Sequence, residues 1–342
     1  MKNIIIFFGI ITLMFSGFHS SIAQEHQKIA QTGCQFLSVI TDARAAAMGG
    51  AVTTLDMGSA SLFFNPAGIA DMRKLTDISA SYNDWITDIQ HNAFSLAINP
   101  LHGRFGVLGF TVQTVDYGGN FYGTIEDRTG ASDYINTGEL SPSAMAFGIG
   151  YAKALSDRFS VGAQVRWINQ DFGTFTVPVT VVVSEDSSSH STEQISYNKR
   201  PVAYDFGTIF KTGYKSLAFG MSVRNFSKEM KYIEEGFQLP LVFTLGIHID
   251  LMDFVEMAGP RQSAIFSINA SHFRSHAEQF IAAIDYTLMN AISLRMGYVN
   301  GNDEDGINYG VGFSLIGLSI DYAYTPFGVF DSVQRFSVRL SL

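Results

Sequence analysis

The stretch FSVGAQVRWI, at residues 159–168, shows the pattern that best indicates the fold of this chain. One face carries Phe159, Val161, Ala163, Val165 and Trp167, and the other carries Ser160, Gly162, Gln164 and Arg166. A period of two with one apolar face is typical of a half-buried β-strand. The same alternation recurs over residues 241–250 and again over 335–342 at the C-terminus. We therefore expect a protein made mainly of β-strands.

The number and length of such stretches distinguish a membrane barrel from a soluble β-sandwich. Most run about ten residues or more, the length that a tilted strand needs to cross a bilayer, whereas strands of soluble sheets average about five or six. The pattern predicts fourteen strands, at roughly 77–83, 89–99, 103–117, 143–154, 158–173, 200–212, 215–226, 239–250, 261–274, 278–288, 291–300, 306–316, 317–326 and 333–342.

The connections between these strands alternate in length. Most even-numbered connections are short, at 99–102, 155–157, 213–214, 289–290 and around Gly317; the exception is 251–260. Many odd-numbered ones are long or polar, at 118–142, 174–199, 227–238, 301–305 and 326–332. Short turns on one side and long loops on the other are typical of an outer-membrane barrel, with the short turns periplasmic and the long loops extracellular. Closure requires the last strand to pair with the first, because hydrocarbon cannot solvate an open sheet edge.

The composition agrees with a transmembrane β-barrel. Charged residues make up 15%, against roughly 25% in soluble domains, while there are 32 glycines and 13% aromatic residues. The mean hydropathy of +0.14 is too low for a bundle of membrane-spanning helices. The net charge of −9 argues against a nucleic-acid partner, which would require a basic face. Aromatic residues near strand ends are candidates for the interfacial girdle, namely Tyr82, Trp85, Tyr117, Trp167, Tyr298 and Tyr324.

Two segments precede the predicted barrel of residues 77–342. Residues 1–23 have the basic start, apolar core and Ser21-Ile22-Ala23 cleavage site of a signal peptide. Residues 24–76 are expected to form a plug, in which Asp42 caps a short helix and Gly49 and Gly50 end it. We expect this Gly/Ala-rich segment at the periplasmic mouth. Cys34, the single cysteine, is expected to be a buried packing residue.

No catalytic or metal site is predicted. The sequence contains no phosphate loop, nucleophile elbow, H-E-x-x-H helix or cysteine metal pair, so neither an enzyme nor a cofactor is expected. Charged residues on predicted lumen-facing positions instead suggest a structural network, with a polar permeation or ligand path as the alternative. The candidates are Arg166, Arg224, His248, Asp250, Asp285, Arg295, Asp321, Arg335 and Arg339.

The connection 174–199 contains an apolar, β-prone run, VPVTVVV at 177–183. An exposed run of this kind predicts a docking surface for an extended partner segment. A strand that projects above the membrane is the equally supported alternative. The candidate docking residues are Val177, Val179, Val181, Val182 and Val183.

Three motifs carry a family resemblance. The run ARAAAMGG at 43–50, followed by SASLFFNPAG at 59–68, resembles the N-terminal signature of the PorV/PorQ family of Bacteroidetes outer-membrane proteins. The stretch DYAYTPFG at 321–328 is similar to that family's penultimate strand and last loop. Asn-Pro-Ala-Gly is also shared with the FadL-type transporters, 14-stranded barrels with an N-terminal hatch. The motif residues singled out are Arg44, Gly49, Gly50, Asn65, Pro66 and Gly68, and we expect them to be architectural.

The resemblance implies a non-enzymatic outer-membrane barrel of type IX secretion. Its protein partners would be the secretion translocon, the attachment complex or the C-terminal signal domains of exported cargo, and outer-membrane lipid would surround it. The alternative is a FadL-like channel for hydrophobic small molecules. One departure is the C-terminal Leu342, where barrels commonly end in an aromatic residue.

Overall fold

The computed structural model describes residues 32–119, 121–126, 133–184, 187–231, 236–255, 261–301, 306–328 and 332–342. The predicted signal peptide lies outside these residues. No helix among the described residues is long and apolar enough to cross a membrane.

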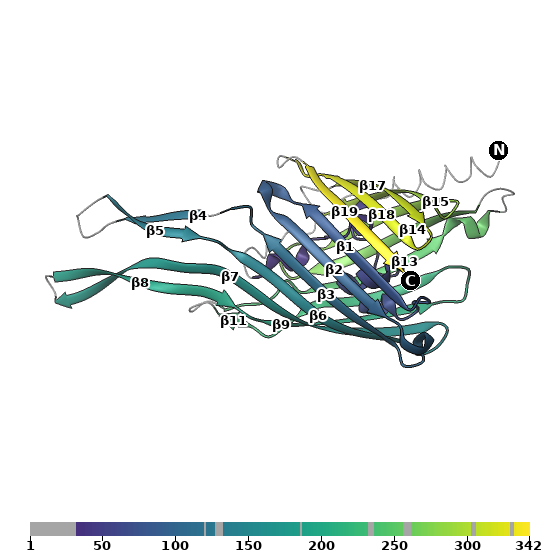
Figure 1. Ribbon diagram of the computed structural model, residues 1–342, viewed down its shortest axis with the longest axis horizontal. Coiled ribbons are helices and arrows are strands. Elements are labelled where there is room, and N and C mark those ends of the chain that lie inside the picture. Colours follow the sequence, from purple (N-terminus) through teal and green to yellow (C-terminus); the bar gives the residue numbers. More distant parts are fainter. Residues whose placement is uncertain are drawn as a thin grey trace.

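Fourteen antiparallel strands close into a barrel, as predicted (Figure 1). Strand β1 pairs with β19, with Tyr82 opposite Phe336, and β6 pairs with β7, so the ring has no open edge. The barrel strands are β1 (Thr76–Asp84), β2 (Gln90–Ile98), β3 (Val107–Asp116), β6 (Ser143–Ala154), β7 (Phe159–Ser184), β9 (Val202–Lys211), β10 (Ala218–Phe226), β13 (Val242–Asp250), β14 (Gln262–Phe273), β15 (Gln279–Leu288), β16 (Ile292–Asn300), β17 (Ile307–Leu315), β18 (Leu318–Pro326) and β19 (Ser332–Ser341).

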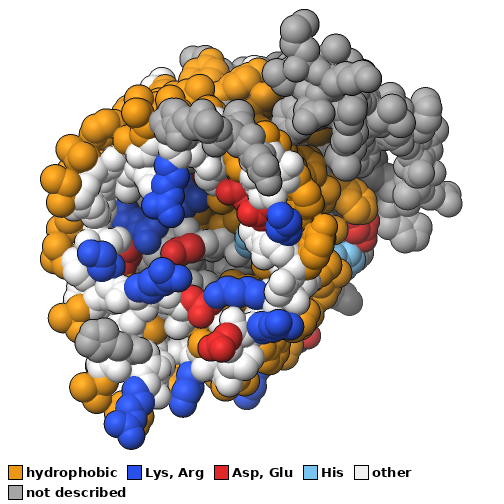
Figure 2. Space-filling view, turned by 90° about the vertical axis from the view of Figure 1, so that its right-hand side faces the viewer, with side chains coloured by type: hydrophobic (Ala, Val, Ile, Leu, Met, Phe, Trp, Pro, Cys, Tyr) orange, Lys and Arg blue, Asp and Glu red, His pale blue; other side chains and the backbone are white. Residues whose placement is uncertain are grey.

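Alternation along each strand separates an apolar outer wall from a polar lumen. In β16, Leu294 and Met296 are 54% and 42% exposed on the outside, whereas Ser293 and Arg295 are buried inside. Figure 2, which views the short-turn end, shows hydrophobic side chains around the outer wall and charged side chains gathered in the hollowed mouth. An outer wall this apolar is suited to lipid rather than to water.

The connections follow the predicted alternation, and the long-loop end carries additional strands. Strands β4 (Phe121–Glu126) and β5 (Tyr134–Leu140) form a hairpin, β8 (Ser187–Lys199) pairs with the outer part of β7, and β11 (Met230–Lys231) pairs with β12 (Gly236–Phe237). Both long hairpins project from the same end of the barrel (Figure 1). At the other end, one short connection contains the 3-10 turn η5 (Pro100–Gly103), and the longer connection between β13 and β14 begins with η6 (Leu251–Phe254). The first long-loop-side connection contains η4 (Ile86–Asp88).

Residues 32–75, here called the inner segment, lie within the lumen. The inner segment contains η1 (Gln35–Ser38), α2 (Ala43–Ala47), η2 (Gly58–Phe63) and η3 (Pro66–Ile69). As predicted, Asp42 caps α2, and its Oδ1 accepts a hydrogen bond from the Ala45 N–H at 2.9 Å. Small residues let α2 approach the wall closely, so Ala43, Ala46 and Ala47 cluster with Ala323 of β18.

The inner segment runs the length of the lumen, so it extends beyond the short-turn mouth where the sequence placed it. Thr32 bridges to Gln238, and the Gly33 N–H donates to the Gln238 carbonyl at 3.0 Å, in the connection between β10 and β13 at the long-loop end. Near the short-turn end, the Ser59 N–H donates to Asp77 Oδ1 at 2.7 Å, at the start of β1. The depth of the inner segment cannot be predicted from local sequence, because it depends on contacts with distant strands.

Cys34 is buried, and we expect its thiol to be unreactive in the folded barrel. It is 2% exposed and packs in a cluster with Phe36, Ile168 and Leu239. Burial raises the pKa of the Cys34 thiol to about 12, so roughly one molecule in 10⁴ carries the thiolate at pH 8. Maleimide labelling at pH 8 should be at least a hundredfold slower than in protein unfolded in guanidinium. Comparable rates in the two states would contradict this burial.

Candidate functional site

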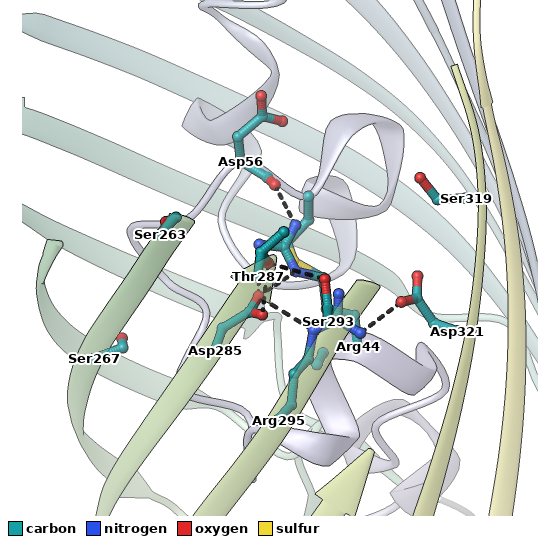
Figure 3. Close-up of polar contacts among 12 residues, drawn as sticks. Arg44, Asp56, Ser263, Ser267, Asp285, Thr287, Ser293, Arg295, Ser319 and Asp321 are labelled. Carbon is teal, nitrogen blue, oxygen red and sulfur yellow. Dashed lines mark hydrogen bonds and ion pairs between the residues drawn. The ribbon is translucent and has the colours of Figure 1, made fainter. Parts of the chain in front are cut away.

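A charge network fixes the inner segment to one side of the lumen (Figure 3). Arg44 Nη2, from α2, lies 3.0 Å from Asp285 Oδ2 of β15, and Arg295 Nε of β16 lies 3.1 Å from the same oxygen. Arg295 Nη1 lies 2.5 Å from Asp321 Oδ1 of β18. Arg44 also donates from Nη1 to the Asp56 carbonyl at 2.9 Å. The network thus joins three barrel strands to the inner segment.

Two further ion pairs join neighbouring wall strands, and one of them also reaches the inner segment, because Arg339 Nη2 lies 3.7 Å from Asp56 Oδ1. Arg339 Nε lies 2.8 Å from Asp77 Oδ2, across the β1–β19 seam that closes the barrel. Arg166 Nε lies 2.7 Å from Asp205 Oδ2, on the neighbouring strands β7 and β9. Asn225 also contacts Asp205, through a hydrogen bond from its backbone N–H at 2.7 Å. These pairs connect wall strands to one another.

The remaining predicted network residues make separate local contacts. Arg224 donates from Nη1 to the Phe63 carbonyl at 2.7 Å, and Arg335 donates from Nε to the Ile40 carbonyl at 2.8 Å, so both hold the backbone of the inner segment. Asp250 accepts from the Met252 N–H at 2.9 Å and caps η6. The nine candidates therefore form several groups rather than one network, and His248 and Asp250 belong to no ion pair that the structure shows.

Sequence reasoning missed Asp77 and Asp205 as partners. Both lie on lumen faces that the alternation marks, since Asp77, Ser79 and Ser81 are all buried on β1. Arg44 was assigned to the architectural motif, yet it is the inner segment's contribution to the network. Alternation could have placed the two aspartates in the lumen, but not next to a particular arginine.

The other motif residues shape the inner segment. Gly49 and Gly50 adopt φ of +59° and +91° at the end of α2, in the left-handed region that favours glycine. Asn65 Oδ1 accepts from the Ala67 N–H at 3.1 Å, and its Nδ2 donates to the Thr53 carbonyl at 2.8 Å. Pro66 then begins η3. Gly68 packs on Ser61, where an added Cβ would lie 2.7 Å from Ser61 Cβ.

The predicted docking run lies in the outer part of β7. Its backbone is strand, with Val177 opposite Glu193 and Val181 opposite Ser189 of β8. Val179 and Val182 pair with Ser191 and Ser188. The run 177–183 is therefore a projecting strand rather than an irregular loop. Pairing of β7 with β6 extends to Asp171 and with β9 to Trp167, so beyond these points the hairpin leaves the barrel wall.

A cavity of about 740 Å³ opens at the long-loop end. Its wall comes partly from the inner segment, with Phe36, Val39 and Ile40, and partly from the barrel, with Ile281 and Val299. The wall includes Trp85 and Tyr117, two of the residues expected in the outer girdle. Trp85 instead contacts Phe327, with ring centroids 5.0 Å apart. The centre of the Trp85 ring also lies 5.3 Å from the Arg335 guanidinium carbon.

Burial shifts the pKa values of two titratable groups on the rim of the cavity. Burial raises the pKa of Tyr117, although the hydrogen bond from Gln170 opposes the shift. Burial lowers the pKa of His276, whose ring stacks on Phe273 at 4.1 Å. Within the described ranges, no group of three or more His, Cys, Asp or Glu side chains is placed to hold a metal ion.

Solved structures with a similar fold include two toluene transporters and a FadL homologue. The Ralstonia pickettii toluene transporter TbuX matches with a TM-score of 0.54 and 12% identity, over 88% of this chain and 98% of that chain. The Pseudomonas putida toluene transporter TodX matches with a TM-score of 0.53 and 12% identity, over 92% and 98%. A Pseudomonas aeruginosa FadL homologue matches with a TM-score of 0.51 and 12% identity, over 87% and 97%. At such low identity, the likeness establishes the fold alone.

A family model gives the closer assignment. The model for type IX secretion system protein PorV matches residues 22–257. A comparison with curated protein sequences gave no match. The family match covers well over half of the 342 residues, and it agrees with the N-terminal motifs and the FadL-like fold. This outer-membrane β-barrel therefore belongs to the PorV family of type IX secretion system proteins.

Proposed function

We propose that this barrel is a non-enzymatic docking protein, whose long-loop end faces the cell exterior and binds partners of type IX secretion and surface attachment. The partners are cargo with C-terminal signal domains, the translocon or the attachment complex. Membership of the PorV family supports the secretion context. The same orientation places the short turns in the periplasm.

The observation that carries the proposal is the projecting β7/β8 hairpin. In the part of the chain that the structure describes, β8 pairs with β7 alone, and β7 beyond Asp171 pairs with β8 alone. The hairpin therefore presents two sheet edges that can accept an added strand. Main-chain hydrogen bonds of this kind give affinity for an extended segment with little demand on its sequence.

The neighbouring β4/β5 hairpin adds exposed aromatic surface. Phe121, Tyr122 and Tyr134 are 51%, 73% and 63% exposed. Large aromatic side chains contribute much of the affinity in protein interfaces. Their position at the same end as β8 supports a partner-binding role for this end of the barrel (Figure 1).

Shortening the β7/β8 hairpin should abolish partner binding without unfolding the barrel. The variant replaces residues 176–194 by Asn-Gly, which favours a tight hairpin turn directly beyond the Phe175–Ile195 pair. We expect exported proteins with C-terminal signal domains to remain unattached, measured by surface proteomics. In gel electrophoresis, heated and unheated samples of the variant should still migrate differently, which shows that the barrel remains folded. A control variant shortens 251–260 at the opposite end and should leave export unchanged.

The outcome that contradicts the docking proposal is a normal surface proteome in the hairpin variant. A deletion of β4/β5 in parallel shows whether the aromatic hairpin contributes. A second candidate function, passage of hydrophobic small molecules, is favoured by the apolar cavity at the mouth. The inner segment, which occupies the lumen below that cavity, opposes it.

A further inference from the structure

The cavity at the long-loop end has an unusual charge balance for a buried site. Its lining includes two arginines, Arg224 and Arg335, and two histidines, His91 and His276. Of the described residues that line it, none is an aspartate or glutamate. Half of the other lining residues are aliphatic or aromatic, and a third are Thr, Ser or Gln. Cations in such surroundings usually have an anionic partner, because removing a charge from water is costly.

Among the described residues, Arg224 makes no ion pair at contact distance, and the carboxylate that attracts it, Asp205, is shared with Arg166. Its Nη1 donates to the Phe63 carbonyl, and its guanidinium carbon lies 5.9 Å from the centre of the Phe64 ring. Its Nε is buried and has no hydrogen-bond partner. The carboxylate on the adjacent strand, Asp205, is bound by Arg166 at 2.7 Å. A guanidinium has five donors in a fixed fork, so Arg224 retains capacity for an acceptor from outside the chain.

His91 is a second polar residue in the lining of the cavity. It lies on β2 and is 2% exposed, and its Nδ1 has no hydrogen-bond partner in the described structure. The ring lines the cavity and lies beside Trp85, with centroids 6.1 Å apart. A buried polar atom without a partner costs free energy unless a ligand or water satisfies it.

We propose that this cavity binds an organic carboxylate whose apolar body fills the space between Ile40, Ile281 and Phe327, with the carboxylate on Arg224. The volume of about 740 Å³ lies within the range of small-ligand sites. The carboxylate supplies the charge that Arg224 lacks, and the apolar wall supplies affinity for the body of the ligand. A neutral hydrocarbon would leave the guanidinium unpaired. This site is separate from the hairpin edges, so its failure would leave the docking proposal standing.

The same chemistry is found in a small aryl or alkyl carboxylate and in the free C-terminus of a peptide with an apolar last residue. Two pairs of probes distinguish these sources. One pair is phenylhexanoate and its methyl ester. The other is an acetylated pentapeptide, Ala-Val-Val-Leu-Phe, as the free acid and as the amide. Each pair differs in the charge at one end, and the carboxylate is ionised at pH 7.5.

The chain provides its own fluorescent reporter for binding. It has two tryptophans, and Trp85 lines the cavity while Trp167 faces outward and is 46% exposed. In a Trp167→Phe background, the emission of Trp85 reports occupancy of the cavity. Titration of the purified barrel in detergent at pH 7.5 gives the affinity for each probe.

We expect at least one acid to bind at least tenfold more tightly than its neutral counterpart. Arg224→Gln should remove that preference, and Arg224→Lys should keep part of it. Arg200→Gln is the control, since Arg200 is exposed at the same end and donates to Asn169 at 3.1 Å. The acid that binds identifies the source. Equal affinity for acid and neutral probes in the unsubstituted barrel, or no binding of either acid, would overturn the proposal, whatever the folding of the Arg224 variants.

Discussion

Replacing Asp285 by asparagine is expected to lower the free energy of unfolding by about 3–5 kcal/mol, the typical cost of breaking a buried ion pair on one side. Asp285 is 2% exposed and accepts contacts from both Arg44 and Arg295. Asparagine has the same size but no charge. Arg295 would keep its ion pair with Asp321, whereas Arg44 would lose the ion pair that it makes with Asp285. The measurement is the guanidinium midpoint of the barrel in detergent micelles.

Asp71→Asn is the matched control for this prediction. Asp71 pairs with Lys211 at 2.6 Å, but the two side chains are 40% and 46% exposed. An exposed pair contributes at most about 1 kcal/mol, because water and salt screen it. The loss of unfolding free energy therefore depends on how deeply the ion pair is buried, rather than on the number of ion pairs. Equal losses in the two variants would contradict the burial argument.

Replacing Gly162 by valine is expected to displace the inner segment from the wall. Gly162 lies on β7 beneath η3, and an added Cβ would lie 2.5 Å from the Ala67 nitrogen and 2.6 Å from the Pro66 oxygen. These are backbone atoms, which cannot rotate away as a side-chain end can. Overpacking costs about 1–3 kcal/mol and more where the neighbour cannot move. We expect faster proteolysis within residues 55–75 and a lower unfolding midpoint.

Gly306→Ala serves as the control for the Gly162 variant. An added Cβ at Gly306 would meet only the Tyr298 ring at 3.9 Å, an ordinary contact. Its proteolysis pattern should match that of the unsubstituted barrel. If Gly162→Val leaves residues 55–75 as protected from proteolysis as in the unsubstituted barrel, the close packing of η3 on β7 would be contradicted.

The local pattern predicted most of the wall but underestimated one strand. The pattern predicts a strand over 158–173, but β7 extends to Ser184, because the run 177–183 continues the strand as a hairpin with β8. The sequence contains the β-branched residues for this extension, but the polar stretch that follows them favours a loop. A hairpin needs a partner strand, and serine-rich β8 carries little apolar alternation of its own.

The candidate site was less predictable than the wall. Alternation placed Arg166, Arg295 and Asp321 in the lumen, but it could not show that Arg295 bridges Asp285 and Asp321. Trp85 and Tyr117 stand at strand ends, where an outer girdle is expected, and both line the internal cavity instead. At a strand end the alternation stops, so the sequence no longer indicates which way a side chain points.

Local sequence is enough to predict the barrel: period-two alternation assigns each strand an apolar and a polar face, and the need to satisfy every backbone hydrogen bond in lipid requires closure. The folded chain is needed to show which charges meet, how deep the inner segment runs and where a cavity remains. The reason is that these features depend on contacts across the lumen. Arg44 reaches Asp285 across 241 positions of sequence, and no local pattern encodes a distance of that kind.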